Sequence, residues 1–93
     1  MFSVNEYFDG NVKSLGFENK NGAVTIGVMA AGEYEFGTTT IEHMTVTSGK
    51  MTVLLPEETV WKTYNEHETF IVEKNTKFKV KVGESTSYKC VYK

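Results

Sequence analysis

The chain has 93 residues and a formal net charge of −2, a size that fits one domain, spanning residues 1–93, rather than two. The 10 lysines nearly balance the 12 acidic residues, so the composition gives no electrostatic footprint for a nucleic-acid partner. The sequence contains no arginine, which excludes a bidentate guanidinium clamp on phosphate within one chain. The single cysteine, Cys90, excludes an intrachain disulfide and a cysteine-based zinc cluster.

The distribution of apolar residues indicates a soluble protein. No stretch approaches the roughly 20 apolar residues that a membrane-spanning helix needs. The start of the sequence, MFSVNEYF, lacks the charged and apolar regions of a secretory signal. We therefore expect a cytoplasmic protein with no membrane partner. A domain of this size buries only about two thirds of its unfolded surface, so we also expect a homodimer that buries a sheet face.

In chain order, the first predicted elements are two turns and a strand. Residues 9–11 (Asp-Gly-Asn) suit a tight turn, and residues 19–22 contain the strongest hairpin signal, Asn21-Gly22. Both of these residues accept a positive φ at little cost. Residues 23–30 then read as a strand that is interrupted by Gly27.

The middle of the chain predicts further short strands. They cover residues 44–46, 51–55 and 70–72, with turn signals at 48–50 and 74–76. Pro56 closes the second of these strands. Residues 57–64 (EETVWKTY) have the best helical composition in the chain, but eight residues are marginal for an isolated helix, so we expect a loop or a single turn.

Strict alternation marks the last third of the chain. In residues 77–82 (KFKVKV) three apolar side chains share one face and three lysines share the other. In residues 88–92 the side chains of Tyr88, Cys90 and Tyr92 share a face. Many short strands with regular turns and no long helical pattern predict an all-β, antiparallel sandwich or barrel.

Several separated blocks, in order and over nearly the whole chain, resemble one protein family. They resemble the small single-domain cupins known as pyrimidine/purine nucleoside phosphorylases. The blocks are residues 5–8 (NEYF), 12–14 (VKS), 32–36 (GEYEF), 42–49 (EHMTVTSG), 55–56 (LP), Trp61 and 86–90 (TSYKC). The resemblance implies a single-domain cupin-type β-barrel, also described as a double-stranded β-helix or jelly roll.

The general cupin pattern sets metal-binding histidines at fixed spacing from a glutamate. Glu42 and the following Gly49 fit that pattern, but the histidine positions hold Phe36, Thr38 and Phe78. A single carboxylate cannot hold a transition metal tightly, because such sites need about three protein ligands. We therefore expect a cupin cavity with no metal and no other cofactor.

The resemblance implies phosphorolysis of purine and pyrimidine ribonucleosides to a free base and ribose 1-phosphate, with nucleoside and inorganic phosphate as partners. The transition state of such a reaction resembles an oxocarbenium ion, which a nearby carboxylate stabilises. If the cupin register holds, Glu42 points into the barrel and is the candidate catalytic residue. The alternative for Glu42 is a buried structural carboxylate that hydroxyl or backbone donors satisfy.

Other residues are candidates for substrate binding. Lys13, with its neighbour Ser14, and the pair Thr38 and Thr39 are candidates for phosphate or ribose. The alternatives are an exposed strand lysine and threonines chosen for β-propensity.

Four further side chains each have more than one possible role. Either Glu33 or Glu35, which share a strand face, can face the cavity, although a solvated face is the commoner case. Tyr88 can stack on a base or hydrogen-bond the sugar, and the alternative is core packing with its hydroxyl at the rim. Cys90 reads as a small buried hydrophobic residue rather than a nucleophile.

Two other functions are compatible with these residues. A non-catalytic, small-ligand-binding cupin fits the lost metal ligands equally well, because many cavities only bind. A cupin that recruits a metal through Glu42 and residues of a partner chain is the third possibility. Phosphate-dependent release of base from a nucleoside separates the phosphorylase from the non-catalytic binder, and loss of activity or fold with a strong chelator would indicate the metal-recruiting cupin.

Overall fold

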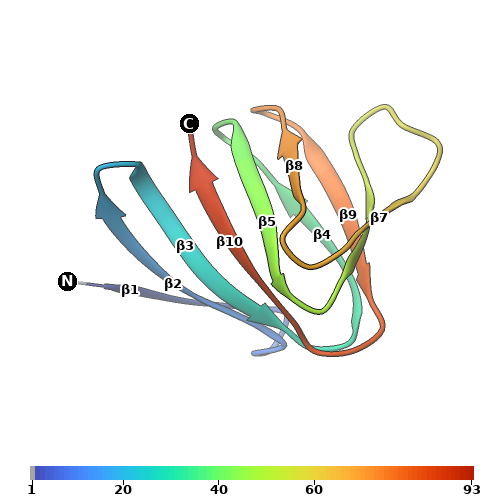
Figure 1. The fold of residues 1–93 in the computed structure, drawn as a ribbon, viewed down its shortest axis with the longest axis horizontal. Coiled ribbons are helices and arrows are strands. Elements are labelled where there is room, and N and C mark those ends of the chain that lie inside the picture. Colours follow the sequence, from blue (N-terminus) through green and yellow to red (C-terminus); the bar gives the residue numbers. More distant parts are fainter. Residues whose placement is uncertain (1) are drawn as a thin grey trace.

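The computed structural model describes residues 2–93, which contain ten strands. Six strands form the larger sheet, in the order β1-β2-β3-β10-β5-β8, and Figure 1 shows them side by side. Their bounds are β1 Ser3–Tyr7, β2 Val12–Asn19, β3 Gly22–Met29, β5 Glu42–Ser48, β8 Thr69–Val72 and β10 Thr86–Tyr92. The C-terminal strand β10 thus lies between β3 and β5, which are far from it in sequence.

The smaller sheet has four strands in the order β4-β9-β6-β7. Their bounds are β4 Gly32–Gly37, β6 Met51–Leu54, β7 Lys62–Tyr64 and β9 Lys77–Val82. All pairings within residues 2–93 are antiparallel, which confirms the predicted fold class. The described chain holds no helix that is long and apolar enough to cross a membrane.

The core lies between the two sheets. The alternation predicted for residues 77–82 is confirmed, because Phe78, Val80 and Val82 are buried and the three lysines are exposed. One hydrophobic cluster joins these side chains to residues of the larger sheet, among them Met29, Val46 and Phe70. Strand alternation therefore sends one set of side chains into a common core and leaves the other set in solvent.

Two local expectations need correction. Residues 57–64 are not wholly a loop, because Lys62–Tyr64 forms strand β7 on the edge of the smaller sheet. There the Tyr64 ring packs on Phe70 at 4.7 Å between centroids, and this contact holds the segment extended. The predicted strand over residues 23–30 is not broken at Gly27, since β3 runs through it in register with β10.

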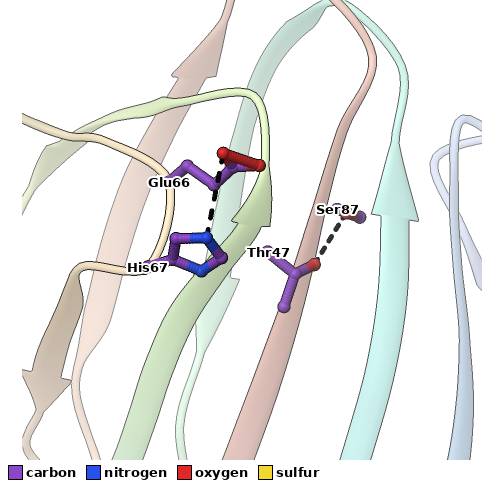
Figure 2. Close-up of polar contacts among 4 residues, drawn as sticks. All are labelled: Thr47, Glu66, His67 and Ser87. Atoms are coloured by element: carbon purple, nitrogen blue, oxygen red, sulfur yellow. Dashed lines mark hydrogen bonds and ion pairs between the residues drawn. The ribbon is translucent and has the colours of Figure 1, made fainter.

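The two histidines lie away from the core. His67 has 82% of its side-chain surface exposed and lies 3.8 Å from a carboxylate oxygen of Glu66 in the loop between β7 and β8 (Figure 2). His43 follows Glu42 on β5 and pairs with Val91 of β10. Figure 2 also shows the hydrogen bond between the hydroxyls of Thr47 on β5 and Ser87 on β10. These two oxygens lie 2.7 Å apart.

Candidate active site between the two sheets

A cavity of about 250 Å³ opens between the two sheets. The larger sheet supplies most of its polar wall, which includes Ser14, Glu42, Tyr88 and Tyr92. Strand β4 of the smaller sheet supplies Glu35 and Phe36. The lining residues include two carboxylates and several hydroxyls but no lysine or histidine. An anion in this cavity must therefore rely on neutral donors of this chain.

Glu42, the candidate catalytic carboxylate, lies in the cavity wall at the first position of β5. It pairs with Tyr92 of β10 and Val72 of β8, so its side chain is flanked by strands on both sides. Burial raises the pKa of the Glu42 carboxyl, and a hydrogen bond from the Cys90 thiol, at 3.6 Å between Sγ and Oε1, partly offsets this. The cavity therefore holds a carboxylate that takes up a proton more readily than one in water.

Cys90 is 1% exposed and lies beside Glu42 on the inner face of β10. Burial, together with the neighbouring Glu42 charge, raises the pKa of the thiol to about 12. A thiol with such a pKa stays protonated at neutral pH and is a poor nucleophile. The sequence predicted a buried, non-nucleophilic cysteine, and the hydrogen bond that it donates to Glu42 is an additional finding.

Tyr88 lies in the cavity because the strand opposite it carries a glycine. Gly27 and Tyr88 are register partners on β3 and β10. A Cβ atom built on Gly27 would lie 2.3 Å from Cζ of the Tyr88 ring, closer than any ordinary contact. Burial raises the pKa of Tyr88 to about 12, so its hydroxyl is a neutral donor at physiological pH. The missing side chain of Gly27 thus leaves room for the Tyr88 ring, and Gly27 does not interrupt strand β3.

Tyr92, four residues beyond Tyr88 on β10, lines both this cavity and a second, open hollow. The hydroxyls of Tyr92 and Thr25 lie 3.1 Å apart, on the side of that hollow, which Ser3, Asn5 and Thr25 also line. Burial raises the pKa of Tyr92 as well. Tyr92 therefore forms a fixed polar wall between the two spaces.

Two of the predicted substrate-binding residues lie outside the cavity. The Lys13 side chain is 61% exposed, and its Nζ lies 3.3 Å from a carboxylate oxygen of Glu6 on the neighbouring strand β1. Glu33 is exposed on β4, opposite Lys81. The side chains of the adjacent residues point to the inside of the protein: Ser14 lies in the cavity wall and Tyr34 lies in the core. Alternation along each strand explains the difference.

The two candidate threonines also lie outside the cavity. Thr38 is 6% exposed, and its hydroxyl donates to the carbonyl of Glu73 at 2.7 Å and accepts from the amide of Thr76 at 3.1 Å. These bonds tie the end of β4 to the turn between β8 and β9. Thr39 is exposed and does not line the cavity. Of the predicted site residues, the structure therefore groups Glu42 and Tyr88 in the cavity wall, together with Ser14 and Glu35, the alternatives to Lys13 and Glu33.

Sequence reasoning missed the aromatic residues at the mouth of the cavity. Tyr7 and Phe8 line the cavity from the end of β1 and the turn that follows it. The Phe8 ring lies 5.0 Å from the Tyr34 ring and 5.6 Å from the Phe36 ring, centroid to centroid. The sequence feature that could have predicted them is the pair of aromatic residues directly before the Asp9-Gly10 turn.

The cupin metal positions do not fit a metal in this chain. The rings of Phe36 and Phe78 lie 5.6 Å apart where two ligands would be, and the Thr38 hydroxyl is occupied by backbone groups. Over residues 2–93, no three His, Cys, Asp or Glu side chains lie close enough together to hold a metal ion. Glu42 is the one expected ligand that is retained, and its chemistry is that of a lone carboxylate.

The two antiparallel sheets and their topology are those of a cupin fold. A crystal structure of an RmlC-like cupin from Shewanella frigidimarina matches with a TM-score of 0.73 and 13% identity over 98% of this chain and 82% of that one. A crystal structure of a protein of unknown function from Vibrio parahaemolyticus matches with a TM-score of 0.94 and 46% identity over 100% of this chain and 99% of that one.

Residues 2–92 match the family model described as pyrimidine/purine nucleoside phosphorylase. A protein of that name from Pseudoalteromonas atlantica is 55% identical over 99% of both chains. Another from Pseudomonas aeruginosa is 53% identical over 100% of both chains. The chain therefore belongs to the pyrimidine/purine nucleoside phosphorylase family, as the sequence blocks indicated.

Proposed function

We propose that this chain is a nucleoside phosphorylase that cleaves purine and pyrimidine ribonucleosides with inorganic phosphate, giving free base and ribose 1-phosphate. The observation that carries the proposal is the family match over residues 2–92. The cavity is consistent with it, because a carboxylate, several hydroxyls and aromatic rings surround one space between the sheets. Such a mixed wall suits a ligand with a sugar, a base and an anion.

In this reaction an oxygen of phosphate forms a bond to the anomeric carbon while the bond from that carbon to the base nitrogen breaks. The bonding electrons leave with the base, which takes up a proton, and the sugar passes through a cationic state. Glu42 in its ionised form stabilises that positive charge, and partial desolvation strengthens the interaction. The Cys90 thiol orients the carboxylate by donating to Oε1.

Phosphate binding has to be explained without a basic side chain in the cavity wall. Ser14, Tyr7 and Tyr88 carry hydroxyls into the cavity, and the high pKa of Tyr88 keeps it a donor. We propose that these hydroxyls hold the phosphate. Neutral donors give weaker hydrogen bonds to an anion than charged donors do, so we expect weak phosphate binding.

The experiment is a base-release assay. Purified protein is incubated with inosine or uridine, with and without phosphate, and free base and ribose 1-phosphate are separated by chromatography. We expect base release only when phosphate is present. Release without phosphate would indicate hydrolysis, and saturable nucleoside binding with no release would indicate a non-catalytic binder. A chelator that abolishes release would indicate a metal recruited through Glu42 and a partner chain.

We also propose that the protein acts as a homodimer. The outer face of the larger sheet exposes a row of apolar side chains across three strands: Val4 is 70%, Leu15 48% and Ile26 42% exposed. A second copy that covers this row would remove apolar area from water. Light scattering coupled to gel filtration tests this, and Ile26→Lys is expected to give monomers.

We further propose a cytoplasmic location, where nucleosides and phosphate are both available and a buried free thiol such as Cys90 stays reduced. Cell fractionation followed by immunodetection tests the location, and recovery outside the cytoplasmic fraction would contradict it.

A further inference from the structure

The turn between β1 and β2 holds a bulky residue in an unfavourable backbone conformation. Phe8 and Asp9 have φ angles of 54° and 57°, and the amide of Gly10 donates to the carbonyl of Tyr7 at 3.2 Å. Two consecutive positive φ angles in a hairpin turn favour glycine, asparagine or aspartate. Asp9 suits this turn, but a phenylalanine at such a position is an outlier. Strain of this kind is concentrated at functional sites.

The strained position places the Phe8 ring across the gap between the two sheets. The ring packs on Tyr34 and Phe36 of β4, and it is nearly perpendicular to Phe36, with an interplanar angle of 89°. Phe36 continues this aromatic wall to Phe78, 5.6 Å away. Phe8 nevertheless stays 43% exposed, whereas Tyr34 is 7% exposed. Core packing therefore uses only part of the Phe8 ring.

The cavity thus has an aromatic side and a polar side. Phe8, Phe36 and Phe78 form the aromatic side, and the polar side carries Glu42 and the hydroxyl-bearing residues. We propose that Phe8 is a specificity-determining residue that stacks on the nucleobase, while the polar side holds ribose and phosphate. This inference rests on the proposed function. It adds that the base is recognised through its face and not through its hydrogen-bonding edge.

Stacking explains how one site accepts both base classes. Every nucleobase has a π face, so an aromatic platform tolerates changes in the base that edge-specific hydrogen bonds would reject. A purine has the larger face and gains more from the platform. Loss of the Phe8 ring should therefore weaken binding of inosine more than binding of uridine.

Two substitutions separate stacking from packing. Phe8→Asn suits the positive φ, and the relief of strain offsets the lost packing of the ring on Tyr34 and Phe36, so we expect a melting temperature close to that of the unsubstituted protein. Phe8→Leu keeps apolar bulk but removes the π face. In both variants we expect the dissociation constant for labelled inosine, measured by equilibrium dialysis, to rise about tenfold or more, with a smaller rise for uridine. The KM for phosphate should stay unchanged. Phe2→Leu is the matched control, because Phe2 is 71% exposed and does not line the cavity.

The contrary results are distinct. If both variants bind inosine and uridine as the unsubstituted protein does, Phe8 has no role in binding the base and the proposal is wrong. A lower melting temperature in Phe8→Asn, with unchanged affinity in Phe8→Leu, would assign Phe8 to packing. Binding that depends on Phe8 without phosphate-dependent base release would overturn the proposed function and leave the stacking role intact. No nucleoside binding by the unsubstituted protein would overturn both.

Discussion

Replacing Gly27 with alanine tests how the cavity is built. In the present structure a Cβ atom at Gly27 would lie 2.3 Å from Cζ and 2.4 Å from the hydroxyl oxygen of Tyr88. An ordinary carbon–carbon contact is about 3.5–4.0 Å, so the ring has to move by more than an ångström. The ring is 7% exposed and borders the cavity, which is the nearest free space. We therefore expect the ring to swing into the cavity.

The expected cost follows from that displacement. Overpacking a protein interior costs about 1–3 kcal/mol, and the free space beside Tyr88 favours the lower half of that range. For a domain of this length, a loss of about 1 kcal/mol lowers the melting temperature by roughly 4–8 °C. Thermal unfolding followed by circular dichroism measures the change. Because the displaced ring fills part of the cavity, Gly27→Ala should also weaken nucleoside binding.

A control and a rescue complete the test. Gly16→Ala lies on the neighbouring strand β2, where a Cβ atom would be 3.5 Å from its nearest neighbour, so we expect little change in its melting temperature. The double variant Gly27→Ala, Tyr88→Leu removes the clash and should recover part of the lost stability relative to Tyr88→Leu alone. An unchanged melting temperature in Gly27→Ala would contradict the proposed contact between Gly27 and the Tyr88 ring. So would an equal loss of stability from Gly27→Ala in the chain with Tyr88 and in the chain with Tyr88→Leu.

Four further substitutions test the site. Glu42→Gln should lower turnover at least about tenfold. Burial raises the Glu42 pKa above its unfolded value, so the native state holds that proton more tightly. The associated stability is present below the unfolded pKa and is lost as pH rises through the folded pKa. The free energy of unfolding, measured by denaturation between pH 4 and pH 8, should fall with rising pH in the unsubstituted protein and not in Glu42→Gln. Identical pH profiles for the two proteins would contradict the raised pKa. Ser14→Ala should raise the KM for phosphate. Lys13→Ala should raise this KM only if the exposed lysine reaches the substrate. A raised KM in Lys13→Ala with an unchanged KM in Ser14→Ala would place the phosphate site at Lys13. Thr38→Val should cost about 1–3 kcal/mol of stability with unchanged KM values, and a changed KM would return Thr38 to the site.

Much of the fold was predictable because strand alternation is a local property. Residues 77–82 showed by themselves which side chains would be buried, and Asn21-Gly22 marked a hairpin turn that the structure contains. Strand β7 was not predictable in this way. Three residues without alternation become a strand only because β6 offers an edge and Phe70 offers a surface for Tyr64.

The site was predictable only where family blocks and strand parity agreed. Glu42 was found because its spacing from Gly49 resembles the cupin pattern, and the structure places it in the cavity wall. Lys13 and Thr38 lie in or beside the same blocks, but one faces solvent beside Glu6 and the other is tied to the backbone of Glu73 and Thr76. The family blocks identify the segments that lie near the site, but they do not show which residue of each segment points into the cavity.

Composition and pattern alone determined an all-β chain with antiparallel strands, a single free thiol and no guanidinium group. Those properties depend on residue type and on contacts between near neighbours. The tertiary structure decided which side chains share the cavity, because β10 inserts between β3 and β5 and brings Tyr88 against Gly27 and Cys90 against Glu42. Contacts across 48 residues of chain, such as that between Glu42 and Cys90, depend on strand order, which no local pattern encodes.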